Sequence, residues 1–196
     1  MLQKLINRIF SNPTIFIVIR RILENNFKGE KKAIREELKT EGKTLDIACG
    51  TGEFCVFFDK SNYLGVDLSK KYINYARKKY GYNFQVADAT KMNIKSEFDN
   101  ILICGLFHHL NDNDVLKILE SSYKMSKNNG SLLVMEDIPT RSKFNFLGKI
   151  VQKFDVGKFI RKHEEYGRLY SSRFNIVKDY KMRTGVNDYS VYVLQK

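Results

Sequence analysis

The stretch TLDIACGTGEF, residues 44–54, decides the fold of this chain. A β-branched and aliphatic run carries Asp46, and a turn of small residues follows it before a new hydrophobic stretch begins. This order is typical of a strand, a glycine turn and the start of a helix. Ala48, Gly50 and Gly52 carry no bulky side chain, so backbone amides at a helix N-terminus could approach a ligand closely. We therefore expect a nucleoside-type cofactor at this turn.

Two further strand patterns also end in acidic residues. YLGVDLS, residues 63–69, delivers Asp67 about 20 residues beyond Asp46, at the spacing where an acid can accept both ribose hydroxyls. FQVADA, residues 84–89, delivers Asp88, where a carboxylate or its neighbouring backbone can meet the amino edge of adenine. The sequence therefore predicts three parallel strands with an acid at each carboxyl end.

This order of motifs resembles the class I methyltransferases that use S-adenosylmethionine. Asp46 to Gly52 resembles the first motif of that family, Asp67 its ribose-binding acid, and Asp88 the acid that closes over the adenine. FDNILICGLFHHL, residues 98–110, resembles the fourth strand and the substrate-facing loop, and NGSLLVMEDIP, residues 129–139, the fifth strand. One departure is Ala48, where the family more often has glycine.

The resemblance implies a doubly wound α/β fold in three layers, with a seven-stranded, mostly parallel sheet and an antiparallel last strand. FNIVKDYKMRTG and DYSVYVLQK, near the C-terminus, alternate like the sixth and seventh strands. The implied cofactor is S-adenosyl-L-methionine, with S-adenosyl-L-homocysteine as product. The implied cofactor-binding residues are Asp46, Ala48, Cys49, Gly50, Thr51, Gly52, Asp67, Leu68, Asp88, Ala89, Cys104 and Gly105.

A nicotinamide-dependent oxidoreductase is the competing interpretation, because it also uses a glycine turn and an acid about 20 residues on. Here the turn is A-x-G-x-G followed by Glu53, which lacks the G-x-G-x-x-G spacing for a pyrophosphate. An acid-lined site also suits a cationic sulfonium and an ammonium better than a pyrophosphate. The sequence favours the methyltransferase.

The length of 196 residues and the absence of repeats or linkers predict one domain. We expect an N-terminal helical lid (1–43), a cofactor-binding core (44–139), and a substrate-side insertion with the last two strands (140–196). Cys49, Cys55 and Cys104 form no C-x-x-C pair, which favours reduced thiols in the cytoplasm and gives no sign of a metal.

The net charge of +12 is unevenly distributed. The predicted core carries 11 basic and 12 acidic residues, whereas residues 1–43 carry 10 and 5, and residues 140–196 carry 13 and 5. Since flanking segments usually cover the mouth of such a site, we expect a small-molecule or lipid-like acceptor that is anionic. Lysines that only solvate helix faces are the alternative.

The first forty residues contain helix-spaced apolar positions on both sides of Asn12 and Pro13, with Pro13 in the first turn of a helix capped by Ser11 or Asn12. The apolar run 15–19 is far shorter than the roughly 20 residues of a membrane span. This segment is predicted to be a lid, and peripheral membrane contact through these helices is the alternative.

His108 and His109 follow the fourth strand and are the candidates for a catalytic base, of which at most one faces the acceptor. The candidate substrate-binding residues are Asp137 after strand five, Arg161 or Lys162 as the holder of an acceptor anion, and Tyr166 as the residue that closes the pocket. Their alternative roles are loop solvation and core packing.

Two alternative functions remain open. An RNA methyltransferase would use the basic and aromatic surface, but the loop after strand four reads GLFHH and lacks the Asn/Asp-Pro-Pro-aromatic motif of amino-directed nucleic acid enzymes. A protein that binds S-adenosylmethionine without transferring its methyl group would also keep Asp46, Asp67 and Asp88. The choice among oxygen, nitrogen and carbon acceptors and the oligomeric state are not predicted.

Overall fold

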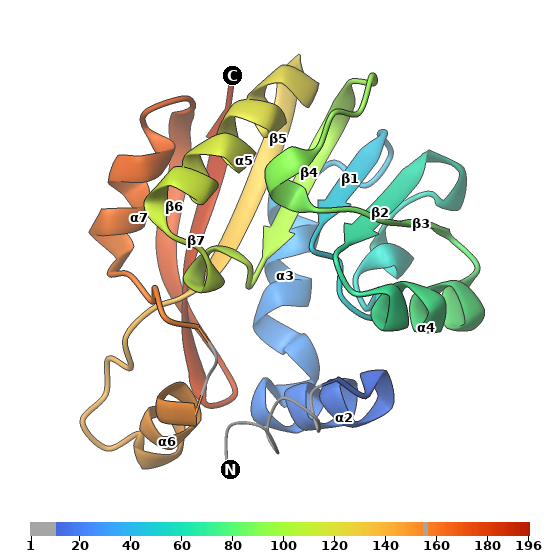
Figure 1. Ribbon diagram of the computed structural model, residues 1–196. Coiled ribbons are helices and arrows are strands. Elements are labelled where there is room, and N and C mark those ends of the chain that lie inside the picture. Colours follow the sequence, from blue (N-terminus) through green and yellow to red (C-terminus); the bar gives the residue numbers. More distant parts are fainter. Residues whose placement is uncertain (1–10, 155–156) are drawn as a thin grey trace.

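The computed structural model describes residues 11–154 and 157–196 as a seven-stranded sheet with helices on both faces (Figure 1). The strand order is β3-β2-β1-β4-β5-β7-β6. Among the described strands, β7 runs in the opposite direction to the other six. The strands are β1 (Thr44–Ile47), β2 (Tyr63–Asp67), β3 (Asn83–Val86), β4 (Phe98–Cys104), β5 (Ser126–Asp137), β6 (Asn175–Thr184) and β7 (Asn187–Gln195). The predicted doubly wound sheet with an antiparallel last strand is confirmed.

The core lies on both faces of the sheet. All four residues of β1 are buried, because β1 pairs with β2 and β4 and is covered above and below. One core cluster contains Ile34 and Ile73, and the other contains Ile118 and Tyr166. The first pair comes from α3 (Lys28–Glu37) and α4 (Lys70–Tyr80), the second from α5 (Asp112–Met125) and α7 (His163–Tyr170). Burying each such apolar side chain stabilises the fold by about 1.5–3 kcal/mol.

The predicted helix after the glycine turn is wrong. The connection between β1 and β2 forms two 3₁₀ turns, η2 (Cys55–Phe57) and η3 (Lys60–Asn62), and no α-helix. Only residues 48–62 join these parallel strands, and the glycine turn uses the first five of them. Too few residues remain for a helix that spans the sheet. The backbone amides that follow β1 therefore belong to the turn itself, and no α-helix dipole lies behind them.

Two helices lie at the carboxyl edge of the parallel strands, α2 (Pro13–Leu23) and α6 (Phe146–Phe154) (Figure 1). The Asn12 side chain accepts hydrogen bonds from the amides of Thr14 and Ile15 at 3.0 and 3.2 Å, so the predicted cap and the first-turn proline are confirmed. The apolar positions before Ser11 lie outside the described residues. No helix in residues 11–154 or 157–196 is long and apolar enough to span a bilayer.

The turn between β6 and β7 packs directly against the end of α2. The amide of Val186 donates to the carbonyl oxygen of Leu23 at 2.8 Å, and the hydroxyl of Thr184 donates to the carbonyl oxygen of Glu24 at 2.9 Å. Gly185 lies between them with a φ of +55°, and a Cβ there would overlap the Leu23 carbonyl oxygen. This turn therefore anchors α2 over the sheet edge.

Replacing Gly185 with alanine is expected to lower the free energy of unfolding by about 3 kcal/mol, because it adds a steric overlap to the left-handed backbone cost. Gly81→Ala is the matched control, since its φ is +66° but its nearest neighbour is the flexible Lys60 side chain at 3.3 Å. That variant is expected to lose about 1–2 kcal/mol. Urea unfolding measures both. Equal losses would contradict the tight packing of the turn against α2.

Candidate functional site

The turn after β1 presents bare backbone to open space. Ala48, Gly50 and Gly52 have φ values of +60°, +55° and +79°. A Cβ on Gly50 would meet no atom within 4 Å, whereas a Cβ on Gly52 would crowd the Phe84 ring. Ala48 holds a glycine-like conformation at a cost of about 1–2 kcal/mol, which the surrounding structure must offset. Gly50 is therefore the point of the turn where a ligand can approach most closely.

Asp67 ties the end of β2 to this turn. Its Oδ2 accepts the amide of Gly50 at 2.9 Å, and its Oδ1 accepts the amide of Ser69 at 2.7 Å. Burial raises the pKa of Asp67, and these two amide hydrogen bonds oppose that shift. Each carboxylate oxygen can still accept another hydrogen bond, so Asp67 can hold two hydroxyl groups of a ligand as well as the turn.

Asp88 is placed differently from its predicted position at the end of a strand. β3 ends at Val86, and Asp88 caps the 3₁₀ turn η4 (Ala89–Lys91), where it accepts from the amide and hydroxyl of Thr90 at 2.9 and 2.7 Å. Its carboxylate is partly exposed and borders the same cavity as Asp67. The structure thus brings these two acids together as the sequence predicted.

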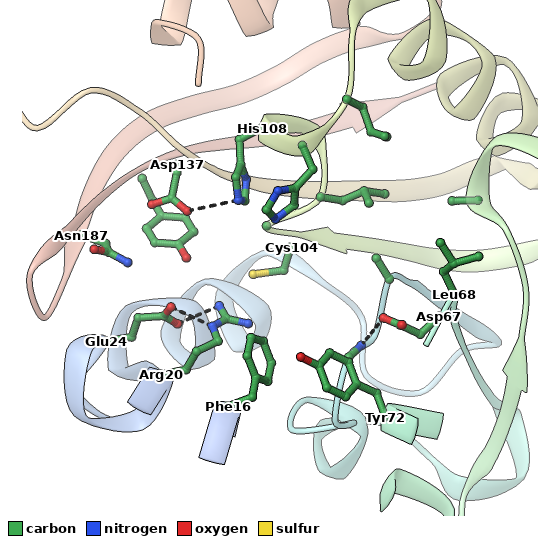
Figure 2. A pocket seen from close by; sticks show the side chains of 18 of the residues that line it. Phe16, Arg20, Glu24, Asp67, Leu68, Tyr72, Cys104, His108, Asp137 and Asn187 are labelled. Atoms are coloured by element: carbon green, nitrogen blue, oxygen red, sulfur yellow. Dashed lines mark hydrogen bonds and ion pairs between the residues drawn. The ribbon is translucent and has the colours of Figure 1, made fainter. Parts of the chain in front are cut away.

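A cavity of about 580 Å³ runs along the carboxyl ends of the parallel strands (Figure 2). This volume lies within the roughly 300–1,000 Å³ of small-molecule sites. Of the predicted cofactor residues, the cavity is lined by Ala48, Gly50, Asp67, Leu68, Asp88, Ala89, Cys104 and Gly105. Burial raises the pKa of the Cys49 and Cys104 thiols well above the usual range, so both stay protonated and uncharged.

Asp46 lies beneath the turn and borders a smaller pocket of about 20 Å³, together with Arg20, Cys49 and Thr51. The Tyr63 hydroxyl donates to Asp46 at 2.7 Å. Burial raises the pKa of Asp46 to about 7, the Tyr63 hydrogen bond opposes the shift, and the charge of Asp67 adds to it. A cationic group that entered this pocket would favour the ionised carboxylate and release its proton.

His108 and Glu136 form a buried pair at the opposite end of the cavity from Asp67 and Asp88. Glu136 accepts from the amides of Leu106 and Phe107, both at 2.8 Å, and its Oε2 lies 2.9 Å from His108 Nδ1. An ionised carboxylate only accepts, so Nδ1 would carry the proton of this hydrogen bond, and Nε2 is the nitrogen left to exchange a proton with a ligand. Nε2 lies 3.9 Å from Asp137, as the dashed line in Figure 2 marks.

His109 is the exposed member of the histidine pair. Its ring packs against His108 with centroids 4.0 Å apart, and both residues line the cavity. His108 is buried, and its Nδ1 lies 2.9 Å from the Glu136 carboxylate, a contact that can orient a general base. Both histidines stay candidates for the catalytic base, and His108 is the first to test.

Several lining residues were missed by the sequence analysis. They come from α2, α4, α6 and the start of β7, and they are Phe16, Arg20, Glu24, Tyr72, Ile150, Val151, Phe154, Asn187 and Tyr189. Phe16 stacks on Tyr72 at 4.9 Å, so α2 closes one side of the cavity against α4. Arg20 donates to both oxygens of Glu24 at 2.8 Å. The i, i+4 spacing of Arg20 and Glu24 was a signal that the sequence offered.

The prediction that Arg161 holds an acceptor anion is wrong, because the Arg161 side chain binds other groups of the protein. It donates to Asp112 at 2.6 Å and to the carbonyl oxygens of Phe107 and Leu110 at 2.9 and 2.7 Å. A buried guanidinium needs these partners, so Arg161 braces the loop that carries His108. It does not line the cavity.

Tyr166 does not close the pocket as predicted. It is fully buried in the core, and its hydroxyl donates to the carbonyl oxygen of Asp137 at 3.2 Å. Its ring packs between α7 and the sheet, because α7 must bury an aromatic face there. Asp137 itself lines the cavity, at the position predicted for a substrate-side residue.

Comparison with known proteins agrees with this geometry. Residues 44–130 match a family model described as a methyltransferase domain. YqeM of Bacillus subtilis (strain 168), which is named as a methyltransferase, is 27% identical over 150 residues, covering 72% of this chain and 58% of its own. The ubiquinone biosynthesis O-methyltransferase of Pelagibacter ubique (strain HTCC1062) is 31% identical over 125 residues, covering 60% of this chain and 51% of its own. The chain thus spans between half and three fifths of these relatives.

Among solved structures, an S-adenosylmethionine-dependent methyltransferase from Clostridium acetobutylicum ATCC 824 superposes with a TM-score of 0.68. The match covers 91% of this chain and 96% of that protein, at 15% sequence identity. At this identity the match establishes the shared fold, and it extends that fold well beyond residues 44–130.

Proposed function

We propose that this chain is a class I S-adenosylmethionine-dependent methyltransferase and that it transfers a methyl group from that cofactor to an apolar small molecule. The cavity is the observation that carries the proposal, because one continuous space joins Asp67 and Asp88 at one end to His108 and Asp137 at the other. A cofactor and an acceptor can therefore meet inside it.

The residues present fit this cofactor. Asp67 would hold the ribose hydroxyls and Asp88 the adenine, while the open backbone at Gly50 admits the ligand. Asp46 and Arg20, which border the small pocket, would hold the ammonium and the carboxylate of the methionine part. When bound, S-adenosylmethionine supplies a methyl group on a positively charged sulfur, which is activated for in-line displacement.

The polar residues at the other end of the cavity support a proton-abstracting role. Glu136 orients His108 so that Nε2 can take a proton from an acceptor. The imidazolium that forms would lie between the carboxylates of Glu136 and Asp137, which stabilise its charge. Such a base is useful for a hydroxyl or another group that must lose a proton. The name of the Pelagibacter relative, an O-methyltransferase, agrees with a hydroxyl acceptor.

The lining supports a lipid-like acceptor more than an anionic one. Phe16, Ile150, Val151 and Phe154 give the acceptor end an apolar wall. Arg20 is the single lysine or arginine among the described residues that line the cavity, and Glu24 already pairs with it. A second anion in this space would lie near Asp137 and Glu24, at a cost in repulsion. We therefore assign the basic flanks to the surface outside the cavity.

Transfer of a labelled methyl group tests this proposal. The purified chain is incubated with labelled S-adenosylmethionine and either an apolar phenol with an alkyl chain, a water-soluble carboxylated phenol, or RNA. We expect label in the apolar phenol, because the acceptor wall is apolar and His108 can deprotonate a hydroxyl. Label in RNA alone would favour the RNA methyltransferase. Cofactor binding without transfer to any acceptor would favour a binding protein.

A further inference from the structure

The helix α6 exposes large apolar side chains at the carboxyl edge of the sheet. Phe144, Phe146, Leu147 and Ile150 are 86%, 67%, 65% and 52% exposed. In α6, positions 146, 147 and 150 fall on one side of the helix, and Phe144 lies two residues before its start. A folded protein rarely leaves so many neighbouring apolar side chains in water without a partner for them.

The opposite side of α6 is attached to the body of the protein. Asn145 donates to the carbonyl oxygen of Val186 at 2.7 Å and accepts from the amide of Gly148 at 3.0 Å. Gly148 is buried, and Gln152 donates to the carbonyl oxygen of Ile138 at 2.6 Å and accepts from Thr140 at 2.9 Å. The side with the apolar residues is therefore held facing outward.

Basic side chains surround these apolar residues. Between residues 140 and 162, the sequence contains seven lysines and arginines and one acidic residue, Asp155. Arg161 pairs with Asp112, and Arg141 shares Asp188 with Arg183, so both arginines already have a carboxylate partner. The remaining lysines of this stretch, Lys143, Lys149, Lys153, Lys158 and Lys162, are all exposed, and the first three lie in α6 or directly before Phe144. We call the α6 rim Lys143, Lys149 and Lys153 together with Phe144, Phe146, Leu147 and Ile150.

The α6 rim is continuous with the cavity. Ile150 belongs to both, and its neighbours Val151 and Phe154 line the cavity wall. At the same sheet edge, α2 exposes Val18 and Ile22, at 49% and 74% (Figure 1). An apolar path thus leads from the surface of the protein to the acceptor end.

We propose that the α6 rim docks on the surface of an anionic lipid bilayer, with the cavity mouth turned toward the lipids. Exposed Phe and Leu side chains can enter the boundary between head groups and acyl chains, while lysines attract anionic head groups. A second copy of this chain fits the rim poorly. In a two-fold interface each lysine cluster would lie against its own copy, and like charges would repel.

Vesicle flotation, without cofactor or acceptor, tests the proposal on the full chain. We expect the protein to float with vesicles of phosphatidylcholine and phosphatidylglycerol but not with phosphatidylcholine alone, and added salt should weaken the binding. The double change Phe146→Ser and Leu147→Ser should weaken binding about tenfold or more, and so should Lys149→Glu with Lys153→Glu.

The matched control is Lys117→Glu with Lys124→Glu on α5, which makes the same change in net charge at exposed positions that cover a sheet face. The vesicle affinity of this control should stay closer to that of the wild type than the affinities of the rim variants do. Thermal unfolding verifies that every variant is folded. Failure of the wild type to float with anionic vesicles would overturn the proposal.

Equal binding by wild type and rim variants would overturn it too. Sedimentation velocity tests the alternative that a second copy of this chain occupies the rim. A dimer that the rim variants abolish would assign this surface to that second copy and overturn the proposal. The flotation assay needs no methyl transfer, so a negative result here leaves the proposed enzymatic function untouched, and the reverse also holds.

Discussion

Replacing Asp67 with alanine is expected to weaken S-adenosylmethionine binding about 100-fold or more. The variant would lack the hydrogen bonds that the carboxylate accepts from the two ribose hydroxyls, each worth about 1.5–3 kcal/mol for a charged acceptor. It would also lack the hydrogen bond from the Gly50 amide at 2.9 Å, which holds the turn in place. Isothermal titration calorimetry measures the dissociation constants.

Asp88→Ala is the matched control for this prediction. Asp88 borders the same cavity, but its described partners, Thr90 and Lys91, both lie in its own 3₁₀ turn. We expect this variant to bind the cofactor no more than about tenfold more weakly, since it loses one partly exposed contact. If Asp67→Ala were folded and bound as tightly as the wild type, Asp67 would have no part in the site.

Replacing His108 with glutamine is expected to lower kcat by about 10²–10⁴-fold on a hydroxyl acceptor, with the dissociation constant of the cofactor unchanged. Glutamine keeps a polar group near Glu136 but cannot take a proton at neutral pH. The wild-type rate should rise with pH as the base loses its proton, and the variant should lack that rise. Rapid-quench or steady-state methyl transfer across the pH range gives both quantities.

His109→Gln serves as the control, because His109 packs against His108 but is exposed. Its kcat should stay within about threefold of the wild type, the range of an exposed side chain without a role in the reaction. A His108 variant with the kcat and pH profile of the wild type would mean that the buried pair with Glu136 only supports the loop.

The acids at the strand ends could be predicted because they follow from local pattern. A buried run that ends in an acid, as at Asp67, puts the acid at the carboxyl edge of a parallel sheet. The same rule located Asp137 and the two histidines near the acceptor end. The prediction of a helix after β1 failed because the connection to β2 is too short for one, although the sequence at Phe54 is apolar.

The acceptor end depended on contacts between distant segments. Arg20 and Asn187 meet the same cavity from α2 and β7, and no spacing rule relates positions so far apart. Charge and aromatic character alone suggested Arg161 and Tyr166, but burial gave them internal partners. Local motifs could therefore predict residues such as Asp67 that line one end of the cavity, and residue type could not predict which basic side chains line the other.

Calorimetric titration of the wild-type chain with S-adenosylmethionine, and separately with a nicotinamide dinucleotide, tests the central claim most directly. We predict one site per chain with a micromolar dissociation constant for S-adenosylmethionine, and no heat from the dinucleotide. Asp67 and Asp88 line the cavity near an open glycine turn, and Asp46 borders the small pocket beneath that turn. A folded chain that binds the dinucleotide and not S-adenosylmethionine would contradict the account.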